Sequence, residues 1–95
     1  MVRPRKPRRI SRHPAAFYFK PRAIPLSRLK EVNLSLDEFE ATRLCDYRGL
    51  SQKEAAKKMG VSQSTLSRIL NSTRKKIARA LIKGEAIRVS RLPGF

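Results

Sequence analysis

The chain has little of what builds disulfides, metal sites and active sites. Its 95 residues include a single cysteine, Cys45, a single histidine, His13, and no tryptophan. One cysteine excludes an intrachain disulfide, and one cysteine with one histidine cannot supply the four ligands of a structural zinc site. We interpret Cys45 as a small apolar residue within a helix, and we expect no metal or other cofactor. The chain also lacks a glycine-rich phosphate loop and has few acids, so we predict that it is not an enzyme.

Acidic residues and long apolar runs are scarce as well. Seven Asp and Glu stand against 23 Lys and Arg, so the formal net charge is +16. No apolar run is long enough for a signal peptide or a membrane span. These features predict a cytoplasmic protein that binds a polyanion, which would place it at the nucleoid if that polyanion is DNA.

The positive charge is concentrated at the two ends of the chain. Residues 1–30 carry ten Lys or Arg and no acid, residues 31–60 carry five against six acids, and residues 61–95 carry eight against one. A nearly neutral middle segment between basic ends is typical of a folded domain whose two basic ends bind nucleic acid. An anionic membrane is the alternative, but the amphipathic stretch at 63–83 has no tryptophan and is better explained by packing inside a domain.

Residues 1–14 predict a basic arm that is disordered without DNA. They hold three prolines and six Lys or Arg, with too few apolar side chains to offset the entropy of ordering. Prolines keep such a segment extended, so its cations project either into a narrow minor groove or onto phosphates, and both readings stay open. The cations assigned to the arm are Arg3, Arg5, Lys6, Arg8 and Arg9.

Short strands are predicted on both sides of the helical region. In residues 15–34 we expect an extended aromatic segment that packs on the core, with a strand at 17–19 and one or two helical turns at 26–32. Residues 85–95 form a C-terminal extension in which 86–90 alternates like a strand. Its candidate partners are 17–19 and 32–34.

Residues 35–84 predict three helices, each with a serine before its first turn and a glycine after its last. Two of the serines open capping boxes, because a glutamate follows three residues later. The serines are Ser35, Ser51 and Ser62, and the glycines are Gly49, Gly60 and Gly84.

Apolar stripes on the first and third helices predict the core. The first stripe is Leu36, Phe39, Leu44 and Tyr47, interrupted by Glu40 and Arg43. The third-helix stripe is Leu66, Ile69, Leu70, Thr73, Ile77, Ala80 and Leu81. Ala78 and Ile82 fall outside it, which favours either a homodimer contact or burial beneath 17–19 or 86–90.

The stretch 52–70 matches a helix-turn-helix. Ala55 and Ala56 let a second helix pack closely, and Gly60 supplies the left-handed residue that ends the first helix. Val61 and Leu66 are expected to pack in the core between these two helices. We therefore predict a mostly α protein, a three-helix helix-turn-helix domain at 35–84 with an extended basic N-terminal arm and short strands.

The first two turns of the second helix of such a motif reach base edges in the major groove. Arg recognises guanine and Gln recognises adenine through paired hydrogen bonds, whereas Ser and Thr are permissive. The candidate readout residues are Gln63, Ser64, Thr65, Ser67 and Arg68. Phosphates are expected at the start of the first helix of the motif and beside the later turns of the second. The candidate phosphate contacts are Gln52, Lys53, Arg74 and Lys75.

Four stretches taken together resemble one known family. They are RPRKPRRI, FYFKPRAIPLSRLKEVNLSLDEFEATRL, GLSQKEAAKKMGVSQSTLSRIL and TRKKIARALIKGEAIRV. The combination resembles the family called domain of unknown function 134, small prokaryotic proteins predicted to bind DNA, and covers nearly the whole chain. The third stretch is also similar to region four of sigma-70 factors. This resemblance implies DNA binding, with recognition positions at Gln63, Ser64, Ser67 and Arg68.

The sequence thus predicts a sequence-specific double-stranded DNA-binding protein that acts as a transcription regulator. Its recognition helix starts at Gln63, and a homodimer is the expected assembly. Two alternatives stay open: a sigma-like adaptor that binds RNA polymerase, and a nonspecific nucleic-acid-binding protein whose ligands include RNA.

Overall fold

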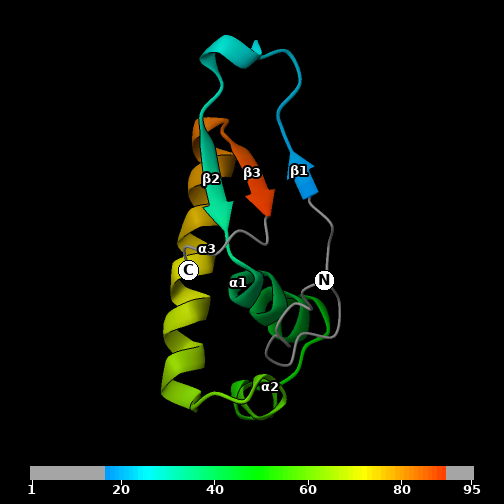
Figure 1. The fold of residues 1–95 in the computed structure, drawn as a ribbon, viewed down its shortest axis with the longest axis vertical. Helices are drawn as coiled ribbons and strands as arrows, with labels where there is room; N and C mark the ends of the chain where they lie inside the picture. The colour runs from blue at the N-terminus through cyan, green and yellow to red at the C-terminus, as the bar shows by residue number, and fades with distance from the viewer. Residues whose placement is uncertain (1–16, 90–95) are drawn as a thin grey trace, which may run out of the picture.

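A computed structural model of the chain describes residues 17–89; the predicted arm, His13 and residues 90–95 lie outside that range. The described part is a small, mostly helical domain with three α-helices beside a three-stranded sheet (Figure 1). The helices are α1 (Leu36–Ala41), α2 (Gln52–Met59) and α3 (Gln63–Lys83), with a 3-10 turn η1 (Leu26–Arg28) and a π-helix η2 (Thr42–Tyr47). The strands are β1 (Phe17–Phe19), β2 (Glu31–Leu34) and β3 (Ala86–Val89). No helix within residues 17–89 is both long and apolar enough to cross a bilayer.

The sheet joins segments from opposite ends of the chain. β3 lies in the middle, antiparallel to β1 with Phe17 opposite Val89, and parallel to β2 with Val32 opposite Ile87. The strand predicted at 86–90 therefore pairs with both candidate partners, although Ser90 is outside the described residues. Helical turns predicted over 26–32 are wrong beyond η1, because the backbone from Glu31 onward is in the parallel ladder with β3.

The first predicted helix is present, but its hydrogen bonding changes halfway. From Thr42 onward, backbone N–H groups bond to the carbonyl five residues earlier instead of four, so η2 is a π-helix. The Arg48 N–H, for example, donates to the Arg43 carbonyl at 3.0 Å. A π-helix turns less per residue, so later side chains rotate away from the direction that an α-helical stripe predicts. Leu44 is buried as predicted, whereas Tyr47 is 84% exposed. The predicted apolar stripe is wrong at Tyr47.

The junction between α2 and α3 has the predicted local chemistry. Gly60 adopts φ +73°, the left-handed conformation that costs glycine least, directly after α2 ends at Met59. Ser62 then caps α3, and its Oγ accepts a 3.1 Å hydrogen bond from the Thr65 N–H. The boundaries predicted for the second and third helices are confirmed.

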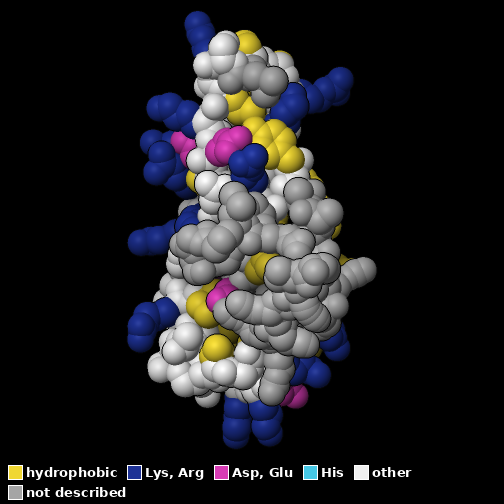
Figure 2. Space-filling view, viewed as in Figure 1, with side chains coloured by type: hydrophobic (Ala, Val, Ile, Leu, Met, Phe, Trp, Pro, Cys, Tyr) yellow, Lys and Arg dark blue, Asp and Glu magenta, His cyan; other side chains and the backbone are white. Residues whose placement is uncertain are grey.

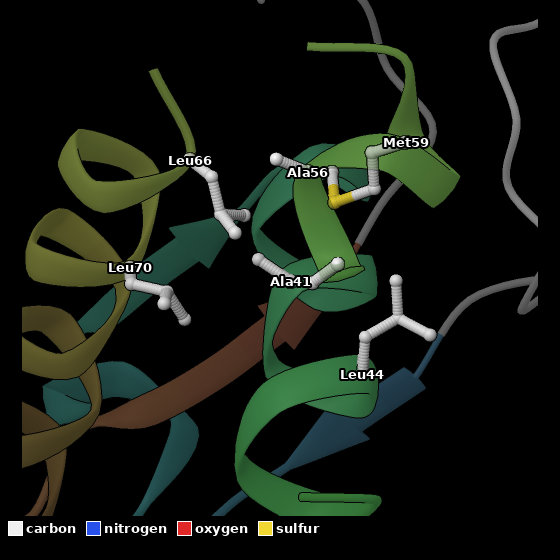
Figure 3. Close-up of a cluster of buried hydrophobic side chains, with 7 residues drawn as sticks. Ala41, Leu44, Ala56, Met59, Leu66 and Leu70 are labelled. Atoms are coloured by element: carbon white, nitrogen blue, oxygen red, sulfur yellow. The ribbon is translucent and has the colours of Figure 1, made fainter. Parts of the chain in front are cut away.

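One apolar cluster joins the three helices. Its buried members are Ala41, Leu44, Ala55, Ala56, Met59, Leu66 and Leu70. In Figure 3, Leu66 and Leu70 of α3 face Ala56 and Met59 of α2 and the α1–η2 helix that carries Ala41 and Leu44. Small side chains at 55 and 56 allow α2 to approach α1 and α3 closely, as the spacing predicted.

Cys45 packs against the edge of this cluster and is half-buried. Burial raises the pKa of its thiol above the ordinary value, and the neighbouring Asp46 raises it further, so the thiol stays protonated at neutral pH. The interpretation of Cys45 as a small packing residue in a helix is confirmed.

The C-terminal half of α3 departs from its predicted stripe. Thr73 and Ala80 are buried, but Leu81 is 75% exposed, so the stripe is wrong at its last member. Within residues 17–89, β2 and β3 lie beside the C-terminal half of α3 (Figure 1). Ile82 is 83% exposed, so of its two alternatives, burial beneath 17–19 or 86–90 is wrong.

Glu38 of α1 links α1 to α3 and, through Lys76, to β2. It is 7% exposed and accepts a 2.9 Å bond from the Ser35 N–H in the α1 capping box. Its carboxylate also accepts 2.9 Å bonds from Ser72 and Lys76 of α3, and Lys76 donates in turn to the Asn33 carbonyl of β2. Burial by itself raises the pKa of Glu38, but the bonds from Ser35, Lys76 and Ser72 outweigh it, so the pKa is lowered.

We expect Glu38→Gln to destabilise the protein at pH 7 by about 1–3 kcal/mol, the range for hydrogen bonds to a charged group. Because the folded-state pKa lies below the ordinary 4.5, the contribution of the carboxylate is complete above pH 4.5 and is lost as pH falls through the folded-state pKa. Urea unfolding at pH 7 and pH 3 should show the difference between wild type and variant shrinking with acid. Glu31→Gln, at an exposed position, is the control; an equal loss in both variants would contradict the role of Glu38.

Candidate nucleic-acid interface

The start of α3 presents polar side chains to solvent. Gln63, Ser64 and Arg68 are exposed, whereas Thr65 and Ser67 are half-buried. The Thr65 hydroxyl accepts a 2.9 Å hydrogen bond from Ser62 and is thereby engaged in the helix cap. The structure therefore brings the five predicted readout residues together on the first two turns, and three of them are exposed.

A cationic face continues along α3 beyond these turns. Arg68, Asn71 and Lys75 are exposed at helical spacing on one side. Within residues 17–89 neither Arg68 nor Lys75 forms an ion pair, so both charges are available to a ligand. Figure 2 shows Lys and Arg side chains projecting at several heights along the edge of the molecule that α3 occupies in Figure 1.

Arg74 differs from its neighbour Lys75. Its guanidinium binds Asp46 of η2 through two bonds, 2.7 Å from Nη2 to Oδ1 and 3.2 Å from Nε to Oδ2. This pairing raises the pKa of Arg74 and orients its side chain toward η2. Of the two phosphate contacts predicted on α3, Lys75 is the unpaired one.

The start of α2 is already occupied by its own capping box. The Ser51 Oγ accepts from the Glu54 N–H at 3.1 Å, and the Glu54 carboxylate accepts from the Ser51 N–H at 3.1 Å. A carboxylate at this position reduces the attraction of the helix end for a phosphate. Of the two phosphate contacts predicted here, Gln52 is half-buried and Lys53 is exposed.

The acidic residues offset only part of the positive charge. All seven lie in the described range, and six of them accept hydrogen bonds: Glu31, Glu38, Glu40, Asp46, Glu54 and Glu85. Arg79 and Glu85, for example, join α3 to the residue before β3 at 2.9 Å. A negatively charged ligand therefore meets unpaired cations and few free carboxylates.

A second cationic group was not predicted. Arg48, Lys57 and Lys58 line a shallow hollow with Gly49, Leu50 and Glu54, beside the start of α2. The sequence pattern predicts no ligand contact for Arg48, Lys57 or Lys58. The sequence does show that Lys57 and Lys58 follow Lys53 by about one helical turn. The tertiary structure places them beside Arg48.

Comparisons with known proteins agree on one family. The family model described as a protein of unknown function, DUF134, matches residues 1–91. A UPF0251 protein of Halothermothrix orenii is 54% identical over 88 residues, which is 93% of this chain and 65% of the relative. A UPF0251 protein of Moorella thermoacetica is 53% identical over 89 residues, 94% of this chain and 60% of the relative.

The chain thus spans less than two thirds of the length of these two relatives. A UPF0251 protein of Dehalococcoides mccartyi is 53% identical over 89 residues, and there the match covers 94% of this chain and 76% of the relative. No solved structure matches the chain. On the family match and these relatives, the chain belongs to the DUF134 family, also called UPF0251.

Proposed function

We propose that the chain is a sequence-specific double-stranded DNA-binding protein and a transcription regulator, in which α2, the turn and α3 form a helix-turn-helix similar to region four of sigma-70 factors. One observation carries the proposal. At the start of α3, exposed Gln63, Ser64 and Arg68 stand on a helix that packs closely on α2, and Arg68 has no carboxylate partner in the described part of the chain.

The chemistry of these groups fits the major groove. A groove about 12 Å wide admits an α-helix, and an unpaired guanidinium bonds guanine through two acceptors. Gln63 can bond adenine through both groups of its amide, and Ser64 tolerates several bases. Lys53 and Lys75 lie at positions that suit phosphate contacts, which hold the helix in place without reading sequence.

Selection of bound duplexes from a random DNA library, at about 150 mM salt, tests the proposal directly. We expect one short motif to be enriched. Tight binding without enrichment would overturn sequence specificity, and would direct the search toward RNA or RNA polymerase as the ligand.

Arg68→Ala should relax the preference at one base pair of that motif, at a cost of about 1–3 kcal/mol for the preferred base. Competition binding with duplexes substituted at each position measures this loss. Arg88→Ala is a matched control, because Arg88 is an exposed arginine on β3 at the sheet end of the molecule. Equal loss of affinity for preferred and random duplexes in Arg68→Ala would remove Arg68 from the readout residues.

A further inference from the structure

The exposed face of α3 changes chemistry along its length. The N-terminal half carries Gln63, Ser64 and Arg68 of the proposed DNA site, and the C-terminal half carries the apolar Ala78, Leu81 and Ile82 among exposed cations. Leu81 is 75% exposed, Ile82 is 83% exposed, and Ala78 is exposed as well. Spacings of three and four residues place these side chains on one side of the helix, adjoining the face that holds Arg68 and Lys75. We call the three residues the apolar patch.

We propose that the apolar patch is a two-fold contact between two copies of this chain, formed only when both are bound to DNA. The inference rests on the proposed function. It assigns a target of two inverted half-sites in successive major grooves, one helical turn apart.

The area of the patch explains why DNA is needed. Three side chains offer on the order of 300 Å² per copy, against roughly 800 Å² per partner in a stable interface. Each copy also carries a formal net charge of +16, which repels a second copy in solution. Phosphates that neutralise the basic surface remove that repulsion, and two adjacent sites raise the effective concentration of the patches.

The length of α3 fits the spacing of major grooves. About 15 residues separate the centre of the readout residues from the centre of the patch, which is about 22 Å along the helix axis. Half-sites one turn apart place two recognition helices about 34–36 Å apart, whereas packed helices stand about 8–10 Å apart. If each α3 tilts by about 35° from the two-fold axis, the two helices touch at the patch and reach the groove spacing at their readout residues. The domain cores then lie on the outer sides, because the opposite face of α3 is the one that packs on α1 and α2.

Three proteins in one selection from a random duplex library test the inference: wild type, the double variant Leu81→Gln with Ile82→Gln, and the control Tyr47→Gln. Tyr47 is as exposed as Ile82 but lies on η2, so the control removes a comparable hydrophobe elsewhere. Glutamine is a good helix former, and substitutions at exposed positions change stability little, which circular dichroism verifies.

We expect wild type and control to enrich inverted repeats with centres about 10–10.5 base pairs apart. The double variant should enrich the single half-site. The wild type should bind the repeat about 5–150-fold more tightly per copy than the half-site, and the double variant should lose that factor. Sedimentation without DNA should show monomers.

Single half-sites enriched by all three proteins would overturn the two-fold contact and leave the proposed function intact. The same repeat enriched equally by the double variant would overturn the role of the patch. A stable dimer without DNA would overturn the dependence on DNA. Absence of any enriched motif would overturn both the proposed function and this inference.

Discussion

We expect Leu66→Ala to lower the free energy of unfolding by about 2–5 kcal/mol, the cost of removing a large apolar side chain from a packed core. Leu66 is fully buried, and from α3 it faces both α2 and the α1–η2 helix (Figure 3). The cavity would be lined by side chains from three helices, which cannot all relax toward it. Small domains are stable by only about 5–15 kcal/mol, so this loss is a large share of the total.

Urea unfolding followed by circular dichroism measures the effect. Leu81→Ala is a matched control, because it makes the same change on the same helix at a position that is 75% exposed. Its cost should stay within about 0.5 kcal/mol. If the two leucine variants lose equal stability, α3 is not anchored through Leu66 as the structure describes.

Affinity for duplex DNA should fall about 10³–10⁵-fold between 50 and 200 mM salt. The reason is counterion release: six to ten phosphate contacts from Lys and Arg displace a corresponding number of condensed cations, and added salt opposes that release. Lys53, Lys75 and the basic arm are the expected sources of these contacts. Fluorescence anisotropy of a labelled duplex across a potassium chloride series gives the slope.

Deletion of residues 1–12 removes six Lys and Arg and should reduce that slope. Binding should weaken for the selected motif and for a scrambled duplex alike, because phosphate contacts carry no sequence information. A slope corresponding to two phosphates or fewer in the intact chain would contradict a basic surface lying along the DNA backbone. A deletion that weakens only the selected motif would instead place the arm among the readout groups.

Helix boundaries were predictable because the groups that set them are neighbours in sequence. Ser35, Ser51 and Ser62 cap the helices that they precede. Gly60 and Gly84 take the left-handed conformation where α2 and α3 end. The cap at Ser62 and the spacing of apolar residues also predicted that polar residues at the start of α3 are exposed to solvent.

Features that depend on distant contacts were not predictable in this way. Nothing in the local sequence distinguishes Arg74 from Lys75, yet Arg74 is held by Asp46, 28 residues away. The switch to π-helical bonding in η2, which turns Tyr47 outward, has no signal that periodicity could detect. Both alter which side chains a ligand can reach.

Local chemistry alone therefore set where the helices begin and end, which side of α2 faces inward and which residues open α3. Capping hydrogen bonds join residues within one helical turn, and the helical period of 3.6 residues can be seen among nearby positions, so both can be predicted from the local sequence. Tertiary structure decided that β3 stands between β1 and β2 and that Leu81 and Ile82 stay uncovered. The partner of a strand and the burial of a side chain depend on which segments, distant in sequence, pack beside them. Those contacts exist only in the folded chain.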